Sequence, residues 1–252
     1  MSSWDWQVFC RDTISGEDVA GCFAQGGDQT YLQWMLHAWG WTVTVSLSAL
    51  AVALFMGSVV GVLRTLPNSR FWLRLGNGWV ELFRNIPLLV QVFIWYYVVP
   101  GLIPATRDVS PMLLMIVALG LFTSARVAEQ LRSGIQALPR GQRYAGMALG
   151  FTTWQYYRFV LLPMAYRIIL PPLTSESMNI FKNSAVAFAV SIPELTQFYL
   201  QAGEETGRQI EIYLGVLVLY VISALAVNRV MTVIERRLRV PGMVAAGGAG
   251  GH

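Results

Sequence analysis

Charged residues are scarce in this chain of 252 residues. Asp, Glu, Lys and Arg together make up 13% of it, whereas a soluble domain carries roughly 25%. Hydrophobic residues reach 55%, and the mean hydropathy is +0.50. So few charges and so many apolar side chains exclude a disordered chain, and they predict a membrane protein.

The chain also has few of the side chains on which catalytic sites are built. Its two histidines, His37 and His252, cannot form a zinc site of the H-E-x-x-H type or a Ser–His pair. The one lysine, Lys182, follows Phe181, so the chain has no G-K-[ST] loop with which to bind ATP. We therefore predict a protein that is not an enzyme and that binds no metal and no cofactor.

Blocks of basic residues, which mark nucleic-acid binding, are missing as well. The 18 basic residues outnumber the 14 acidic ones, but they flank apolar stretches and never form a run of five. They therefore predict contact with membrane lipid at the ends of spans, and no nucleic-acid partner.

Five stretches are apolar enough to cross a bilayer, which takes about 20 residues of helix. We predict an all-α membrane protein with five transmembrane helices, at about residues 41–63, 86–103, 111–131, 168–193 and 212–233. The fourth stretch is the least apolar, because it contains two adjacent prolines, a glutamate, a lysine and two asparagines.

Most of the basic residues gather in three segments, 64–85, 126–167 and 229–239. Basic loops remain in the cytoplasm, so we predict that these segments lie inside and that the N-terminus lies outside. An odd number of spans fits this orientation. The predicted organisation is an external N-terminal segment, a membrane domain and a cytoplasmic tail, at residues 1–38, 39–235 and 236–252.

Cys10 and Cys22 both precede the first predicted span. If this segment faces an oxidising compartment, the two residues can pair in a disulfide. Two free thiols fit the sequence equally well.

The predicted inner segment from 134 to 167 is long for a connection in so small a protein. Two short helical patterns meet within it at Gly150. The first pattern carries Ala145, Gly146 and Ala148, whose small side chains let another surface approach the helix backbone closely. This predicts a docking element, and an amphipathic hairpin lying on the membrane is the alternative.

The chain resembles bacterial ABC-importer permeases in the sequence of their EAA coupling loop. The matching residues are QRYAGMALG at 142–150 and Leu-Pro at 162–163. Within that group, the chain is similar to the polar amino-acid permease family, of the histidine/glutamate type, through ELFRNIPLL at 81–89. It resembles the permease subunits of glutamate/aspartate importers through GLFTSARVAEQ at 120–130 and PPLTSESMN at 171–179.

This resemblance implies the type I ABC importer permease fold, in the bacterial inner membrane, with a periplasmic N-terminus. It implies a companion permease, two separate ATPase subunits that bind ATP and Mg²⁺, and a periplasmic substrate-binding protein as partners. Carried onto this sequence, it places the ATPase contact at Tyr144, Ala145, Gly146, Leu149 and Gly150.

The chain departs from the family pattern at two positions of this loop. Tyr144 stands where the family has its glutamate, and Gly146 stands at the family's second alanine. A charge-assisted contact with the ATPase is therefore missing on this side. We expect that the companion permease retains the glutamate and that the two permeases form a heterodimer.

Ionisable groups within spans are costly, and they indicate function. Arg126 lies about 15 residues into the third predicted span, roughly 22 Å from its outer end. Its planar guanidinium can hold a carboxylate at two points, and Lys182 could meet a second one. We predict a substrate path with Arg126, Lys182, Glu176, Asn179 and Ser184. The alternatives are that Arg126 anchors its helix at the inner surface and that Glu176 only pairs with a neighbouring helix.

The sequence therefore predicts the permease subunit of an ABC importer for the acidic amino acids glutamate and aspartate. One alternative is the same kind of importer with another polar amino acid as its cargo. The other is a stand-alone carrier or channel, which would have no use for the long inner loop.

Overall fold

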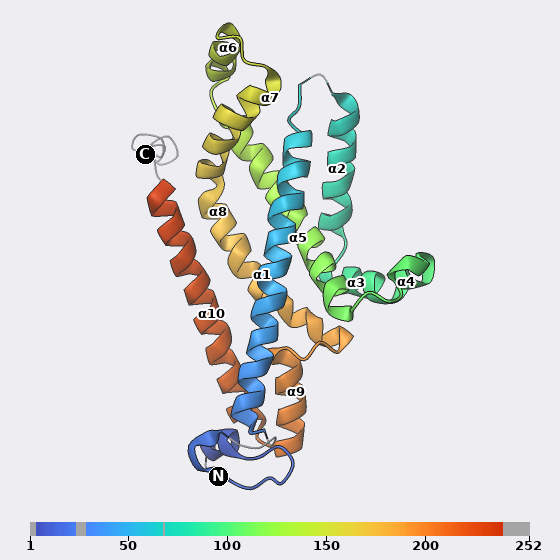
Figure 1. Cartoon of the computed structure of the whole chain (residues 1–252), viewed down its shortest axis with the longest axis vertical. Coiled ribbons are helices and arrows are strands. Elements are labelled where there is room, and N and C mark those ends of the chain that lie inside the picture. Colours follow the sequence, from blue (N-terminus) through green and yellow to red (C-terminus); the bar gives the residue numbers. More distant parts are fainter. Residues whose placement is uncertain (1–3, 24–28, 68, 239–252) are drawn as a thin grey trace, which may run out of the picture. The chain divides into compact units, whose positions relative to one another are not determined.

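The computed structural model describes residues 4–23, 29–67 and 69–238, and the regular elements in these ranges are helices (Figure 1). The helices belong to two compact units, each assembled from three stretches of the chain. The first unit contains the residues up to Ala51, Pro87–Gly120 and Asn179–Leu225. The second contains Val52–Ile86, Leu121–Met178 and the residues from Ala226 onward.

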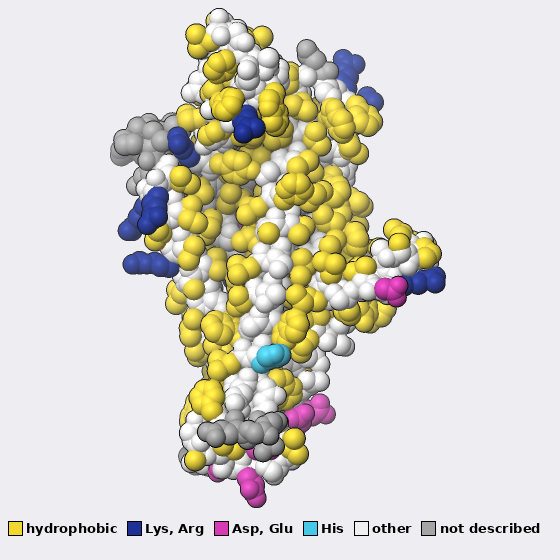
Figure 2. All heavy atoms as spheres, viewed as in Figure 1, with side chains coloured by type: hydrophobic (Ala, Val, Ile, Leu, Met, Phe, Trp, Pro, Cys, Tyr) yellow, Lys and Arg dark blue, Asp and Glu magenta, His cyan; other side chains and the backbone are white. Residues whose placement is uncertain are grey.

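Three helices in the described residues are long and apolar enough to cross a membrane, namely α1 (Tyr31–Leu63), α5 (Pro111–Gln136) and α10 (Gln209–Leu238). They contain the first, third and fifth predicted spans. α2 (Arg70–Asn85) and the stretch Leu88–Leu102 pass the same test as a pair, with a break between them. Hydrophobic side chains dominate the face of the molecule shown in Figure 2, as expected of a protein surrounded by lipid.

The second and fourth predicted spans are irregular. The second is divided among three short elements, α3 (Leu88–Phe93), a π-helical turn (Ile94–Val98) and α4 (Val99–Leu102). The fourth begins within α8 (Leu162–Asn183) and continues into a 3₁₀ helix at Ser184–Val190. α8 carries Pro171 and Pro172 in its interior, and each proline removes a helical hydrogen bond.

Two helices lie partly or wholly within segments for which no helix was predicted. α1 begins at Tyr31, within the segment predicted to be external. Residues 64–85, predicted as a loop, form α2 over most of their length, because their polar and apolar side chains recur with helical spacing. The predicted tail at 236–252 lies outside the described residues beyond Leu238, where α10 ends.

The core of the first unit joins the N-terminal segment to the helices. Val8 is fully buried there, together with Phe198 of α9 (Leu195–Thr206). A Cβ at Gly215 of α10 would lie 2.6 Å from Cζ of Phe9. Glycine at this position therefore leaves room for the Phe9 ring against α10.

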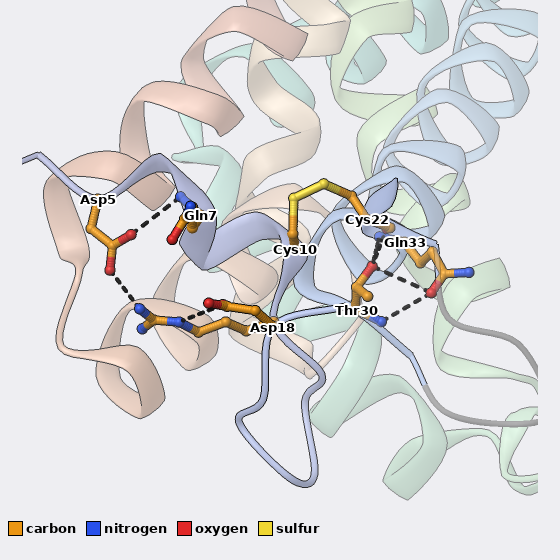
Figure 3. Close-up of a disulfide and its surroundings, with 8 residues drawn as sticks. Asp5, Gln7, Cys10, Asp18, Cys22, Thr30 and Gln33 are labelled. Carbon is orange, nitrogen blue, oxygen red and sulfur yellow. Dashed lines mark hydrogen bonds and ion pairs between the residues drawn. A yellow bond between two sulfur atoms is a disulfide. The ribbon is translucent and has the colours of Figure 1, made fainter. Parts of the chain in front are cut away.

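Cys10 and Cys22 form a disulfide in the N-terminal segment, which decides between the two possibilities that the sequence left open (Figure 3). Beside it, Arg11 forms an ion pair with Asp5 at 2.7 Å. The hydroxyl of Thr30, just before α1, donates a hydrogen bond to the carbonyl of Cys22 at 2.7 Å. These contacts stabilise the fold of the segment that precedes α1 in the chain.

Glycines allow close helix contacts in the second unit. A Cβ at Gly57 of α1 would lie 2.5 Å from Cβ of Val127 in α5. One at Gly134 of α5 would lie 2.5 Å from Cγ2 of Ile169 in α8. Small residues at helix contacts are typical of membrane proteins, where association depends on close packing rather than on the hydrophobic effect.

Candidate coupling loop and substrate path

The predicted docking element is a pair of short helices, α6 (Arg140–Ala148) and α7 (Thr153–Tyr156) (Figure 1). Gly150, between them, has a φ of +79°, in the left-handed region that favours glycine. Its N–H donates to the carbonyl of Met147 at 3.0 Å, and the N–H of Phe151 donates to the carbonyl of Gly146 at 3.1 Å. These two bonds form a Schellman motif, which ends α6 and fixes the turn.

Apolar side chains are exposed on this element. Tyr144, Met147, Leu149 and Trp154 each expose more than half of their surface. Single exposed apolar residues are common, but a group of four on so short an element is typical of a surface that contacts another protein. Tyr144 and Leu149 are thus available for the predicted contact with an ATPase.

Gly146 lies on the side of α6 that faces α7, although the resemblance placed it in the ATPase contact. It is buried, and a Cβ there would lie 3.1 Å from Cδ2 of Tyr156 in α7. The small residue at this position therefore lets α6 and α7 pack together. The side chain of Ala145 lies outside the described residues.

Arg126 and Glu176 of the predicted substrate path come together in the second unit. Nη1 of Arg126 in α5 lies 3.5 Å from Oε2 of Glu176 in α8. The amide of Gln130, one turn further along α5, donates to Oε1 of Glu176 at 3.5 Å. Glu176 thus pairs with a neighbouring helix, α5, in this structure. At 3.5 Å the ion pair is long. It is also partly open to solvent, because 40% of the Arg126 side chain and 13% of the Glu176 side chain are exposed.

The Arg126 side chain points back along its own helix. Its Cζ lies 4.8 Å from the centre of the Phe122 ring, one turn toward the N-terminal end of α5. A cation over an aromatic face is a favourable contact. An arginine that anchored α5 at its C-terminal end would extend in the opposite direction. The guanidinium is therefore positioned by Phe122 and Glu176, and an edge of it stays accessible.

The other three predicted path residues lie in the first unit. Ser184 is buried, and its hydroxyl donates to the carbonyl of Phe181 at 2.7 Å, within its own chain segment. Lys182 is exposed and forms no ion pair with any described residue. Asn179 is partly buried.

A second ionic cluster links Arg64, which directly follows α1, to α2 and α5, and the sequence indicated it only as positive charge at the inner surface. Nη1 of Arg64 lies 2.6 Å from Oε2 of Glu129, and Nε of Arg64 donates to Oδ1 of Asn77 at 2.8 Å. Glu129 also pairs with Arg132 at 3.3 Å, three residues further along α5. Gly76 makes room for the Arg64 stem, since a Cβ there would lie 2.4 Å from its Cγ.

Glu194 is a fully buried carboxyl group in the first unit. It caps α9, because its two oxygens accept the N–H groups of Thr196 at 2.9 Å and Gln197 at 3.0 Å. The hydroxyl of Tyr220 in α10 donates to it at 3.0 Å. Burial nevertheless raises the pKa of Glu194 to about 7, since desolvation disfavours the charged form more than these hydrogen bonds favour it.

Apolar helices, an exposed helical loop and ionic groups inside the bundle define the class of protein as a membrane transport component. The chain belongs to the family of binding-protein-dependent transport system inner membrane components, whose sequence pattern matches residues 53–240. Proteins of this kind are permease subunits, and the chain is accordingly not itself an enzyme.

Known proteins agree with this assignment along most of the chain. The glutamate/aspartate import permease protein GltJ of Escherichia coli strain K12 is 41% identical, covering 95% of this chain and 96% of the relative. The glutamate/aspartate import permease protein GltK of Escherichia coli O6:H1 is 29% identical, covering 78% of this chain and 89% of the relative. A crystal structure of an amino acid ABC transporter with histidines has a TM-score of 0.71 and 28% identity, covering 82% of this chain and 95% of that one. The type I importer permease fold expected from the resemblance is thus confirmed.

Proposed function

We propose that this chain is the permease subunit of an ABC importer for glutamate and aspartate in the bacterial inner membrane. The observation that carries the acidic cargo is the accessible guanidinium of Arg126, which is held beside Glu176 by a long and partly open ion pair. The name of GltJ, 41% identical to this chain, supports the same cargo.

The proposed partners of this chain are a companion permease, two ATPase subunits, a periplasmic binding protein and the surrounding lipid. The family description supports the binding protein, and the exposed side chains of Tyr144 and Leu149 support an ATPase on the coupling loop. Because Tyr144 replaces the family's glutamate, we propose a companion that is a different chain, comparable to GltJ beside GltK.

The proposed topology has five spans, with the N-terminus in the periplasm and the C-terminus in the cytoplasm. α8 and the 3₁₀ helix after it form the fourth span, in which a proline pair is tolerated within the bundle. The Cys10–Cys22 disulfide supports an oxidising compartment for the N-terminal segment. Arg236 and Arg237, in the last turn of α10, support a cytoplasmic end.

In the proposed mechanism, an acidic amino acid exchanges with Glu176 on Arg126. The substrate carboxylate can take up the guanidinium at two points, whereas Glu176 holds it by one 3.5 Å contact. The displaced Glu176 keeps its contact with the amide of Gln130. ATP binding by the partner closes the ATPase dimer and moves the docked α6–α7 element, and the path then opens outward to accept the substrate.

Substrate-stimulated ATP hydrolysis tests this function. The complex is reconstituted with its ATPase, companion permease and binding protein, and hydrolysis is measured with glutamate, aspartate, glutamine, histidine and arginine in turn. We expect stimulation by the two acidic amino acids alone. Stimulation by another member of the set would refute the acidic cargo, and failure of an ATPase to assemble would favour a stand-alone carrier.

A further inference from the structure

An apolar groove of about 280 Å³ opens on the surface of the first unit. The residues around it are hydrophobic, apart from one glycine. Its walls come from three parts of the chain, with Trp6 and Phe9 in the N-terminal segment, Leu32 and Met35 in α1, and Leu214 and Val218 in α10. Apolar cavities exclude water and bind apolar ligands, so this groove is suited to an apolar group.

The groove runs along a helix that is surrounded by lipid. α10 is apolar enough to span the membrane, and only 22% of its most apolar stretch is buried inside the structure. Tyr213, Leu217 and Val221, near the groove residue Val218 in the helix, are all exposed. In a membrane, the apolar groups that surround such a surface are the acyl chains of lipids.

One face of α10 changes from charged to apolar along its length. Arg208, Glu211, Gly215 and Val218 follow one another at intervals of three or four residues, so they lie on one face. Val218 lies about 10 Å beyond Glu211 at 1.5 Å per residue. This face thus has charged groups at one end and the apolar groove at the other, which matches an amphiphilic molecule such as a phospholipid.

The charged end of this face borders a second pocket, of about 360 Å³, which is lined by Trp4 and residues 207–211. The Arg208 side chain is 34% exposed, and its ion pairs with Asp5 and Glu211 are long, at 3.6 Å and 4.0 Å. It therefore remains open to an anion.

Two stacked tryptophan rings connect the pocket with the groove. The ring centres of Trp4, which lines the pocket, and Trp6, which lines the groove, are 5.9 Å apart. Tryptophan is enriched at the level of the lipid headgroups, where its ring contacts both apolar and polar groups. The stack is thus placed where a headgroup meets its acyl chains.

We propose that the pocket and the groove together bind one phospholipid with a zwitterionic headgroup, of the phosphatidylethanolamine class. The phosphate pairs with Arg208, the ammonium group lies against the Trp4 ring beside Glu211, and one acyl chain fills the groove. The opposite charges of Arg208 and Glu211 sum to zero, so they complement a zwitterion better than an anionic lipid. The bound lipid joins the N-terminal segment to α1 and α10, whatever cargo the importer carries.

Photocrosslinking in the complete complex tests the site. The complex is purified in detergent and irradiated with a phosphatidylethanolamine that carries a diazirine in one acyl chain, and the adducts are mapped by mass spectrometry. We expect adducts on groove residues such as Met35 and Leu214. A tenfold excess of unlabelled phosphatidylethanolamine lowers their yield about tenfold, and the same excess of phosphatidylglycerol leaves it unchanged.

A matched pair of substitutions supplies the second measurement. Val218 and Val221 are both exposed on α10, at 55% and 48%, but only Val218 lines the groove. Val218→Trp fills the groove and lowers the yield of adducts about tenfold, whereas Val221→Trp leaves it unchanged.

Four results would overturn the site. They are equal yields for the two variants, adducts that unlabelled lipid does not compete away, equal competition by phosphatidylglycerol, and adducts that form on this chain alone but not in the complete complex. The last result would mean that another subunit covers the groove. Mapping and competition use the unsubstituted complex, so they decide the proposal even if Val218→Trp fails to assemble.

Discussion

Replacing Arg126 with glutamine is expected to slow glutamate import by roughly 10-fold to 100-fold. A hydrogen bond to a charged group contributes about 1.5–3 kcal/mol net, and the amide loses that charge. Each 1.4 kcal/mol corresponds to about tenfold in rate or affinity. Arg126→Lys keeps the charge but loses the planar two-point contact, so it is expected to lie between the wild type and Arg126→Gln.

The ion pair between Glu176 and Arg126, with which the substrate must compete, does not cancel the contribution of Arg126 to import. Glu176 contacts Arg126 at 3.5 Å, and 40% of the arginine side chain is exposed. Exposed ion pairs contribute up to about 1 kcal/mol, so displacing Glu176 costs the substrate at most about fivefold in affinity. Glu176→Gln is accordingly expected to change import much less than Arg126→Gln does.

The assay is the initial rate of labelled glutamate uptake into proteoliposomes, with binding protein saturated by glutamate and with ATP inside. The matched control is Arg158→Gln, because this guanidinium also lies over a phenylalanine ring, 5.7 Å from the centre of Phe159, but pairs with no described carboxylate. Uptake by Arg126→Gln within about twofold of wild type, in complexes that assemble equally, would refute the role of Arg126.

Three further predictions concern the loop, a buried acid and the disulfide. Gly150→Val forces a β-branched residue to a φ of +79°, at a cost of about 1–2 kcal/mol, and is expected to weaken substrate-stimulated ATP hydrolysis. Gly141→Val, at an open helical position, should leave it unchanged, and equal losses would contradict the role of the turn. The raised pKa of Glu194, about 7, means that its contribution to folding is complete below its ordinary pKa of 4.5 and is lost as the pH rises through 7. The melting temperature of the complex should therefore fall between about pH 5 and about pH 8, and Glu194→Gln should reduce that fall; an unchanged pH dependence would exclude this source. Reduction of the disulfide, which closes a loop with a sequence separation of 12, should lower stability by about 2–3 kcal/mol, measured as a lower melting temperature in dithiothreitol. A Cys10→Ser, Cys22→Ser double variant that remains sensitive to dithiothreitol would contradict this cause.

The long apolar helices could be predicted from the sequence because hydropathy alone determines them. No charged residue interrupts α1 between Tyr31 and Leu63, so its membrane-spanning part is evident in the residues. The ends of the helices follow from other forces. The start of α1 at Tyr31 depends on packing against buried neighbours from distant parts of the chain, and hydropathy contains no information about such contacts.

The ion pairs between helices could not be predicted, since they join residues far apart in the chain. Arg64 and Glu129 are 65 residues apart, with α2, α3, α4 and most of α5 between them, and each by itself is typical of positive-inside anchoring or of a solvated turn. Gly76 is the one hint of this cluster in the sequence. A glycine inside a helix lowers the stability of the helix, so its presence suggests that a neighbouring group needs the space, and here that group is the stem of Arg64. In the same way, the loop pattern predicted the turn at Gly150, but the contact of Gly146 with Tyr156 required the structure.

Accumulation of labelled glutamate tests the central claim most directly. Proteoliposomes that contain this chain, the companion permease and the ATPase subunits are supplied with external binding protein and labelled glutamate, with or without internal ATP, beside vesicles that contain this chain alone. The account predicts accumulation against the gradient only for the complete complex with ATP. Accumulation by the single chain, or glutamate uptake that is independent of ATP, would contradict it.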